Sequence, residues 1–211
     1  MKPLNEQISR GWMLFGKTSF GGKSSLMGAY VVSRRPFAGW WEYLLERAIY
    51  TSPPHMQFGG AALIGGDGKL LGIGSLIVGD AAGPAKPVPG NMFIPIDYLK
   101  PILADLLEQG RAASTARPWL GLTSEEVRGR LHVMRVARGG PAHQAGIRPG
   151  DLVIGVDGKP VTGLADFYRR VWAKGKAGVA VPVNVLQGIT AKPVVIKSSS
   201  RYDWLRLKRS Y

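Results

Sequence analysis

The 211-residue chain contains no cysteine. This absence excludes disulfide bonds, thiolate zinc clusters and thiol catalysis, but it does not decide between cytosol and periplasm. The chain also lacks any run of about 18 apolar residues, so no helical membrane span is expected. Its first residues, MKPLNEQISRG, have no apolar core of the kind that a signal peptide needs. Read literally, the chain starts in the cytosol.

Acidic residues are scarce, because 14 Asp and Glu stand against 28 Lys and Arg and give a formal net charge of +14. Such an excess favours polyanions or anionic membrane surfaces by electrostatics. The basic residues are nevertheless scattered along predicted strands, helix faces and turns, with one dense run at residues 201–209. A solvated basic surface explains this distribution, so we expect no nucleic-acid partner.

Short apolar runs dominate what is present, and many are β-branched, as in LVIGV and VAVPVNV. Turn formers are abundant, with 29 Gly and 15 Pro. Short β-branched runs separated by turn formers are typical of a mainly β protein. The length accommodates two modules of roughly 100 residues, each able to bury a core of its own.

Residues 1–110 carry apolar runs separated by Gly, Pro, Ser and Asp, a spacing that suits a small antiparallel barrel. The segment Gly65-Gly66-Asp67-Gly68 predicts a tight hairpin turn. Apolar residues then recur at helical spacing, and we expect a helix capped by Asp97 and ended by Gly110. The small polar stretch at residues 111–117 is the expected linker.

After the linker, strands are predicted at residues 131–136, 151–157, 179–186 and 193–197. A short helix is expected from Pro141 to Gly146 and a longer one from Leu164 to Ala173. These elements predict a compact second domain at residues 118–200, followed by a basic tail at residues 201–211.

Residues Gly11 to Thr18 match the phosphate-binding pattern GxxxxGK[ST] letter for letter. That mechanism needs a buried strand before the first glycine and a helix after the lysine, so that backbone N–H groups converge on phosphate. Here the preceding residues are polar, the interior WMLF is itself strand-like, and no helical periodicity follows. We therefore expect no nucleotide site and no other cofactor.

The run from Ala137 to Val161 resembles the core of a bacterial PDZ domain. It contains a GGPA helix start, an AGI helix stop, an RPGD turn and an LVIGVDG strand and turn in that family's order. Upstream, WLGL resembles the family's carboxylate-binding loop. The resemblance implies that protein or peptide C-termini bind there as an added strand, beside a wall formed by the longer helix. The implied peptide-binding residues are Trp119, Leu120, Gly121 and Leu122 of the loop and Phe167, Tyr168 and Val171 of the helix. Aromatic residues at such spacing are often core, so the alternative that two of these three are simply core residues stays open.

Residues 58–73 resemble the segment that follows the nucleophile in the HtrA/Deg family of trypsin-like proteases. Phe58-Gly59-Gly60, a small residue, a hairpin and Gly72-Ile73 follow the family's order, and the segment from Asn91 to Ile96 resembles its barrel exit. The resemblance implies a mainly β fold: the second of the two trypsin-like antiparallel barrels, followed by the PDZ domain.

Where that family has Gly-Asn-Ser, this chain has Met56-Gln57-Phe58. A phenyl ring has no oxygen to attack a carbonyl, so we expect no acyl-enzyme chemistry and no catalytic residue, with Met56 and Gln57 as the former oxyanion loop. The Phe58 ring is expected to fill the former pocket. The histidines at 55, 132 and 143 are interpreted as structural or exposed. Nothing in the sequence places a base beside Ser52 or Ser75.

The sequence therefore predicts a degenerate, N-terminally truncated HtrA/Deg-like pseudoprotease that binds C-termini or extended segments as a scaffold, sensor or chaperone-like protein. The alternative is a serine endopeptidase of that family, with the rest of its catalytic domain upstream. No metal is expected. By family resemblance the protein is placed in the bacterial periplasm, with protein quality control as its context, and an oligomer is an option.

Overall fold

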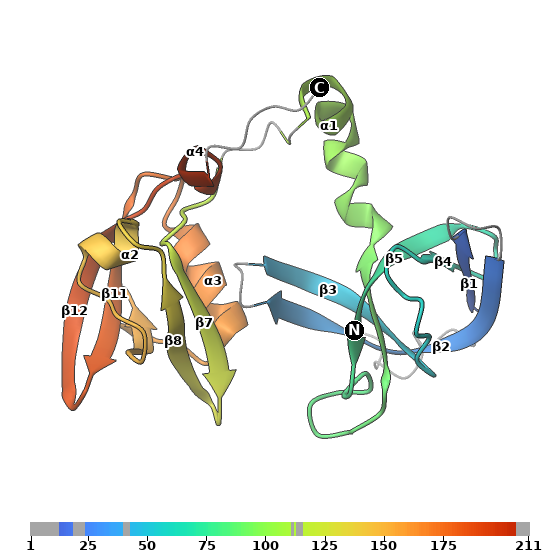
Figure 1. The fold of residues 1–211 in the computed structure, drawn as a ribbon, viewed down its shortest axis with the longest axis horizontal. Helices are drawn as coiled ribbons and strands as arrows, with labels where there is room; N and C mark the ends of the chain where they lie inside the picture. Colours follow the sequence, from blue (N-terminus) through green and yellow to red (C-terminus); the bar gives the residue numbers. More distant parts are fainter. Residues whose placement is uncertain (1–12, 19–23, 40–42, 111, 113–115, 206–211) are drawn as a thin grey trace, which may run out of the picture. The chain divides into compact units, whose positions relative to one another are not determined.

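The computed structural model describes residues 13–18, 24–39, 43–110, 112 and 116–205. The chain divides into two compact units (Figure 1). The first comprises residues 1–37 and 45–112, and the second comprises residues 38–44 and 113–211. The two units are described one at a time below.

The first unit is built around a closed antiparallel barrel, which confirms the predicted fold class. Its strand order is β1-β2-β3-β6-β5-β4, so that β1 pairs with both β2 and β4 and closes the sheet. Closure removes the exposed edges that an open sheet of this size would carry. The strands are β1 (Met13–Thr18), β2 (Ser24–Gly39), β3 (Tyr43–Ser52), β4 (Ala62–Ile64), β5 (Leu70–Val78) and β6 (Gly90–Pro95).

The phosphate-loop pattern falls largely within β1. Gly16 pairs with Leu26 of β2 and with Ala62 of β4, and Lys17 and Thr18 continue the ladder with β2. Extended backbone that is paired on both sides cannot fold around a phosphate group as a loop before a helix does. Gly11 and Trp12, at the start of the pattern, lie outside the described residues.

Two glycines allow the barrel backbone to pack closely. A Cβ at Gly74 would lie 2.0 Å from the carbonyl oxygen of Phe58, and a Cβ at Gly90 would lie 2.0 Å from that of Thr51. Both distances are far inside van der Waals contact, so each position requires glycine. The predicted hairpin turn between β4 and β5 is present, with Gly68 at φ +76° and its N–H donated to the carbonyl of Gly65 at 2.9 Å.

A buried phenol lies under a guanidinium in the barrel. Tyr50 is 2% exposed, and the guanidinium carbon of Arg35 lies 3.6 Å from the centroid of its ring. Arg35 also donates to the carboxylate and the carbonyl of Asp80 at 2.8 and 3.0 Å. Burial raises the pKa of Tyr50 to about 12, and the nearby Arg35 charge opposes part of that rise. The arrangement ties β2 and β3 to the loop that follows β5.

The helical segment after the barrel differs from the prediction. Two 3₁₀ turns, Ile96–Tyr98 and Lys100–Ile102, precede the helix α1 (Leu103–Gln109). Asp97 therefore does not cap α1. It lies in the first 3₁₀ turn and pairs with Lys100 at 2.7 Å. Pro101 accounts for the delayed start, because a proline has no N–H to donate and its ring clashes with the preceding helical turn. Gly110 ends α1 at φ +67°, as predicted.

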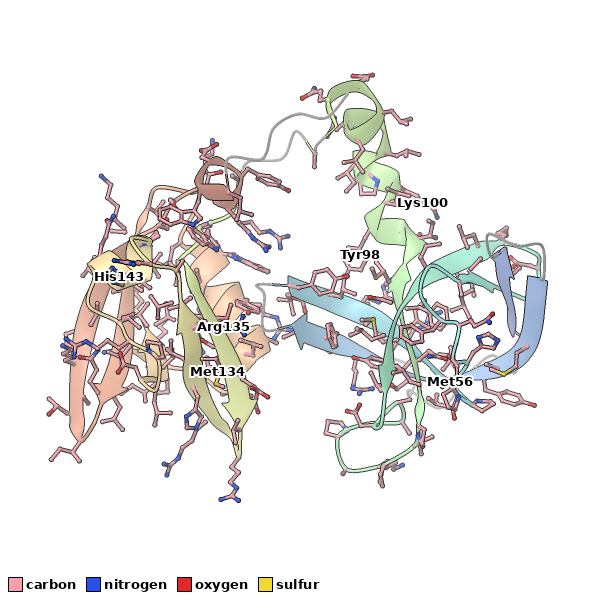
Figure 2. All side chains as sticks on the ribbon, in the orientation of Figure 1. Met56, Tyr98, Lys100, Met134, Arg135 and His143 are labelled. Carbon is pink, nitrogen blue, oxygen red and sulfur yellow. The ribbon has the colours of Figure 1, made fainter. Side chains whose placement is uncertain are left out.

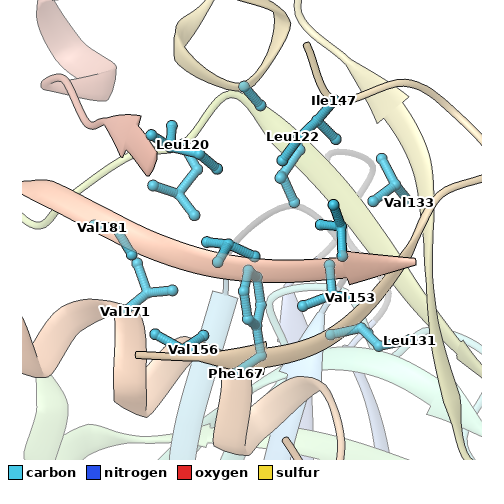
Figure 3. Packing of buried hydrophobic residues seen from close by; sticks show 14 of the residues in the cluster. Leu120, Leu122, Leu131, Val133, Ile147, Val153, Val156, Phe167, Val171 and Val181 are labelled. Atoms are coloured by element: carbon cyan, nitrogen blue, oxygen red, sulfur yellow. The ribbon is translucent and has the colours of Figure 1, made fainter. Parts of the chain in front are cut away.

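The second unit contains a six-stranded sheet in which β12-β11-β9-β8-β7 are neighbours and β10 pairs with β9. Side chains from alternate sheet positions and from the longer helix meet in one core, including Val133, Val153, Phe167 and Val171 (Figure 3). The strands are β7 (Leu122–Val127), β8 (Arg130–Val136), β9 (Leu152–Val156), β10 (Lys159–Pro160), β11 (Ala180–Gln187) and β12 (Thr190–Lys197). The helices are α2 (Pro141–Gln144), α3 (Leu164–Ala173) and α4 (Arg201–Leu205).

Candidate peptide-binding groove and former nucleophile loop

The predicted carboxylate-binding loop is fixed by its own carbonyl groups. The N–H of Ala142 donates to the carbonyl oxygen of Leu120, and that of Ala137 donates to the carbonyl oxygen of Gly121, both at 2.8 Å. In a planar trans peptide the C=O and the next N–H point in opposite directions. The Gly121 N–H therefore points away from α2, and the Leu122 N–H points away from β8. Two successive donors are thus aimed outward.

Gly121 holds this geometry through a positive φ of +74°. A Cβ there would lie 3.1 Å from Cδ of Pro141 and 3.3 Å from the ring of Trp119. Both the backbone angle and the space favour glycine. Among the described residues no acceptor is recorded for the Gly121 N–H.

The strand that follows the loop is an edge of the sheet. In the described part of the chain β7 pairs only with β8, so its other side offers main-chain groups to an added strand. One register irregularity lies between Thr123 and Ser124 of β7, and the extra residue is Met134 on β8. The alternation along β7 is therefore regular, with Leu122 and Ser124 buried.

The helix residues predicted to line the groove are core residues in the structure. Phe167, Tyr168 and Val171 are 1%, 3% and 2% exposed and belong to the main cluster of the second unit. Tyr168 also stacks on Trp172 with ring centroids 5.4 Å apart, and its hydroxyl donates to the carbonyl of Gly39 within the same unit. These three side chains therefore offer almost no surface to a ligand: all three lie in the core, where the alternative expected two.

The chain beyond residue 200 is not simply a basic tail. Residues 201–205 form α4, and its Trp204 packs on Trp119 with ring centroids 5.3 Å apart. Trp119 also exchanges two backbone hydrogen bonds with Ser199, at 2.9 and 3.0 Å. The loop is therefore supported from the C-terminal side of the domain. The sequence feature that could have indicated this packing is Trp204, an aromatic residue within the basic run. Residues 206–211 lie outside the described residues.

Sequence reasoning also missed Glu126. Its carboxylate accepts the N–H of Leu164 at 3.3 Å and so caps the start of α3 from the edge strand. A Cβ at Gly163 would lie 2.6 Å from the same carboxylate, so the glycine makes room for it. Residues 126 and 164 are far apart in sequence, which is why no local pattern indicated the contact.

In the barrel, the loop before Phe58 is anchored by a buried amide. Asn91 is fully buried, accepts the N–H of His55 at 2.7 Å and donates to the carbonyl of His55 at 3.2 Å. Nδ1 of His55 accepts the N–H of Gln57 at 3.0 Å. The His55 imidazole thus helps to fix the backbone of the loop. The other two histidines lie in the second unit, His132 on β8 and His143 on the surface of α2 (Figure 2).

The backbone of Phe58 takes part in the hydrogen bonding of the loop. Its carbonyl accepts the N–H of Ala61 at 3.0 Å, and the neighbouring Gly60 N–H donates to Gly74 at 2.9 Å. The residue is partly buried, and the expectation that its ring fills the former pocket stays a prediction. Met56 is 77% exposed and lies on the surface of the barrel (Figure 2).

Ser52, one of the two serines weighed as an alternative nucleophile, binds a backbone carbonyl: its hydroxyl donates to the carbonyl of Pro89 at 2.9 Å. No group of three or more His, Asp or Glu side chains in the described part of the chain is placed to hold a metal ion. None of the helices there is long and apolar enough to cross a membrane.

Comparison with known proteins agrees with both halves of this geometry. Residues 118–197 match the PDZ domain family. The chain is 28% identical over 148 residues to the serine protease Do-like HtrA of Bacillus subtilis, an alignment that covers 61% of this chain and 31% of that protein. It is 29% identical over 141 residues to the serine endoprotease DegS of Escherichia coli, covering 61% and 38%. This chain is thus an HtrA-like protein with a PDZ domain.

Solved structures of similar fold align with most of the chain. The HtrA-type protease AlgW with a decapeptide aligns with a TM-score of 0.58 at 20% identity, covering 93% of this chain and 62% of that one. A serine endoprotease from Yersinia pestis aligns with a TM-score of 0.53 at 23% identity, covering 90% and 62%. These likenesses show the fold. The alignments with the two curated relatives span about a third of those proteins.

Proposed function

We propose that this HtrA-like chain is a non-catalytic protein that captures peptide C-termini through its PDZ domain, in a scaffolding, sensing or chaperone-like role. One observation carries the proposal. The hydrogen-bonded carbonyls of Leu120 and Gly121 aim the next two N–H groups outward, beside the open edge of β7.

Such donors suit a terminal carboxylate. A carboxylate loses its hydration when it binds, and pre-aimed backbone N–H groups replace that hydration without further ordering of the loop. The rest of the ligand then adds as a strand along β7, so that main-chain hydrogen bonds supply affinity independently of sequence. The solved structures of the HtrA-type protease AlgW with a decapeptide and with a tripeptide are consistent with peptide binding in a protein of this fold.

The non-catalytic part of the proposal is supported by Phe58. The residue stands where the family has its serine, and its side chain offers neither a nucleophilic oxygen nor a proton for a base to remove. The related proteins are named as serine proteases, so the competing function is an active endopeptidase. By analogy with the family, we propose the bacterial periplasm as the compartment and protein quality control as the setting.

The test compares peptides that differ only at the C-terminus. Calorimetric titration of the full chain with peptides that end in an apolar residue is expected to give at least tenfold tighter binding for the free acid than for the amide. The expected ratio corresponds to about 1.4 kcal/mol, which is the size of one hydrogen bond to a charged group.

Equal affinity for acid and amide would reject capture of the terminal carboxylate and leave internal strand addition as the binding mode. A control titration at several salt concentrations separates local capture from attraction to the basic surface. Affinity that falls steeply with salt for acid and amide alike would point to a general binder of anions.

A further inference from the structure

We infer that Glu126 selects ligands that carry a basic side chain four residues before their C-terminus. The inference rests on the proposed function and specifies its ligand. It follows from three features of the second unit: the outward N–H groups at Gly121 and Leu122, the regular alternation of β7, and the position of Glu126 on that strand.

The register follows from the loop. A carboxylate held by the outward N–H groups places the last ligand residue beside Leu122, and an antiparallel ligand strand then runs along β7 with its earlier residues opposite later ones. The third residue from the end lies opposite Ser124, and the fifth lies opposite Glu126. Residues directly opposite each other in antiparallel strands point to the same face, with Cβ atoms about 5 Å apart.

The edge strand β7 carries two buried hydroxyl groups without a hydrogen-bond partner among the described residues, those of Thr123 and Ser124. Ser124 is 1% exposed. A buried hydroxyl without a partner costs free energy. Ser124 lies between Leu122 and Glu126 in the alternation, on the face that ligand side chains would share.

The Glu126 carboxylate is held in place by a hydrogen bond, and its negative charge can still pair with a ligand cation. One carboxylate oxygen accepts the Leu164 N–H at the start of α3, where the helix dipole favours negative charge. No Lys or Arg of the described residues forms an ion pair with Glu126 or with its neighbour Glu125. The carboxylate is exposed at the far end of the edge strand from the carboxylate-binding loop.

This is notable because the second half of the chain is basic. Residues 111–211 contain 18 of the 28 Lys and Arg but only 6 of the 14 Asp and Glu. Asp166 and Asp157 are already paired with Arg170 and Lys174, at 2.9 and 2.8 Å. At physiological salt, charges are screened over roughly 8 Å. Distant Lys and Arg residues therefore repel a basic ligand side chain only weakly, and its contact with Glu126 depends on the charges nearby.

The experiment titrates the full chain with matched free-acid peptides that share an apolar C-terminal residue and differ only at the fifth position from the end, which is Lys, Gln or Glu. At low salt the Lys peptide is expected to bind about two- to fivefold more tightly than the Gln peptide, as for an exposed ion pair, and the Glu peptide more weakly than both. Moving the lysine to the sixth position from the end, which lies opposite Val127 on the other face, should abolish the preference.

Glu126→Gln should remove the preference for lysine. Its amide oxygen still accepts the Leu164 N–H, so α3 keeps its cap and the Gln peptide should bind as before. Glu125→Gln is the matched control: it removes the same charge from the neighbouring residue on the opposite face, and it should leave the preference in place.

A preference that survives Glu126→Gln, that is lost equally in both variants, or that favours the Glu peptide would overturn the inference. These results differ from failure of the proposed function, in which free acids bind no better than amides. Free acids that bind tightly without regard to charge at the fifth position would reject the role of Glu126 alone.

Discussion

Two loops, one in each unit, show how differently a binding function and a catalytic function depend on side chains. The barrel loop at residues 53–60 is anchored by Asn91 through His55, and the PDZ loop at residues 119–122 is anchored through Ala137 and Ala142. Both loops retain an ordered backbone. They differ in which atoms would do the work.

For the proposed capture, the working groups of the PDZ loop are backbone N–H donors, which every residue except proline supplies. Their direction is set by hydrogen bonds to the carbonyl groups and by the positive φ of Gly121. In the barrel loop the working group of the family is a single side-chain oxygen, and Phe58 does not carry one. On the proposed function, one substitution would be enough to remove catalysis while the fold remains, whereas peptide capture would tolerate most changes outside Gly121.

The largest effect is expected for catalysis itself. The wild-type chain should hydrolyse no unfolded casein and should not be labelled by serine-directed phosphonates, because loss of the nucleophile in a serine protease costs on the order of a millionfold in turnover. Mass spectrometry of the labelled chain is the measurement. A label mapped to any serine in residues 50–80 would contradict the comparison between the loops.

Phe58→Ser is expected to stay inactive as well. A hydroxyl alone is a weak nucleophile and needs a base within hydrogen-bond reach. The nearest candidate in sequence is His55, whose Nδ1 already accepts the N–H of Gln57. Detectable labelling of the variant at residue 58 would show that a base is available after all.

The next effect concerns stability of the barrel alone. Gly74→Ala places a Cβ 2.0 Å from the Phe58 carbonyl and should destabilise the barrel by about 3 kcal/mol or more, since neither backbone can move far. Hydrogen exchange should show lost protection in β4 and β5 and unchanged protection in β8 and β9. Gly66→Ala, with nothing within 4 Å of its Cβ, is the control and should change stability by less than about 0.5 kcal/mol. Equal loss of protection in both units would mean that they unfold together.

A smaller cost in stability but a large one in binding is expected at the PDZ loop. Gly121→Ala forces a side chain into the left-handed region, at about 1–2 kcal/mol, and against Pro141 and Trp119. Because relief of that strain rotates the outward N–H groups, free-acid peptides should bind at least tenfold more weakly in calorimetry. Gly188→Ala has the same backbone penalty, at φ +59°, with nothing within 4 Å. If both variants bind equally well, the loop is not the site of capture.

How far the sequence could predict the structure depended on whether the decisive contact was local. Pro141 and Gly110 mark helix boundaries through their own backbone constraints, and the structure places boundaries at both. The aromatic spacing of α3 indicated a helix correctly. It could not show that Phe167, Tyr168 and Val171 are all buried, because burial depends on which distant segments cover each side.

The same limit explains the missed site residues. Glu126 reaches a helix 38 positions away, and Trp204 packs on a residue 85 positions before it, so neither contact leaves a periodic signal. Asp97 failed as a helix cap because Pro101 shifted the helix start beyond its reach. Glycine, proline and turn patterns therefore predicted the frame of the groove, and long-range packing decided its lining.

The smallest expected effect distinguishes the barrel from the PDZ domain by pH. Burial raises the pKa of Tyr50 from 10.0 to about 12, so the folded barrel holds this phenol proton more tightly than the unfolded chain does. The resulting stabilisation is fully present below pH 10 and is lost as the pH rises through 12. The difference in unfolding free energy between the wild type and Tyr50→Phe, from urea titrations, should be constant up to about pH 9 and then shift against the wild type between pH 10 and 12.

Tyr30→Phe, which removes a half-exposed phenol from the same barrel, should show no such trend. Because Arg35 lies over the Tyr50 ring and opposes the rise, Arg35→Met should move the loss to still higher pH. A wild-type curve that runs parallel to that of Tyr50→Phe throughout would show that this phenol is not buried against titration.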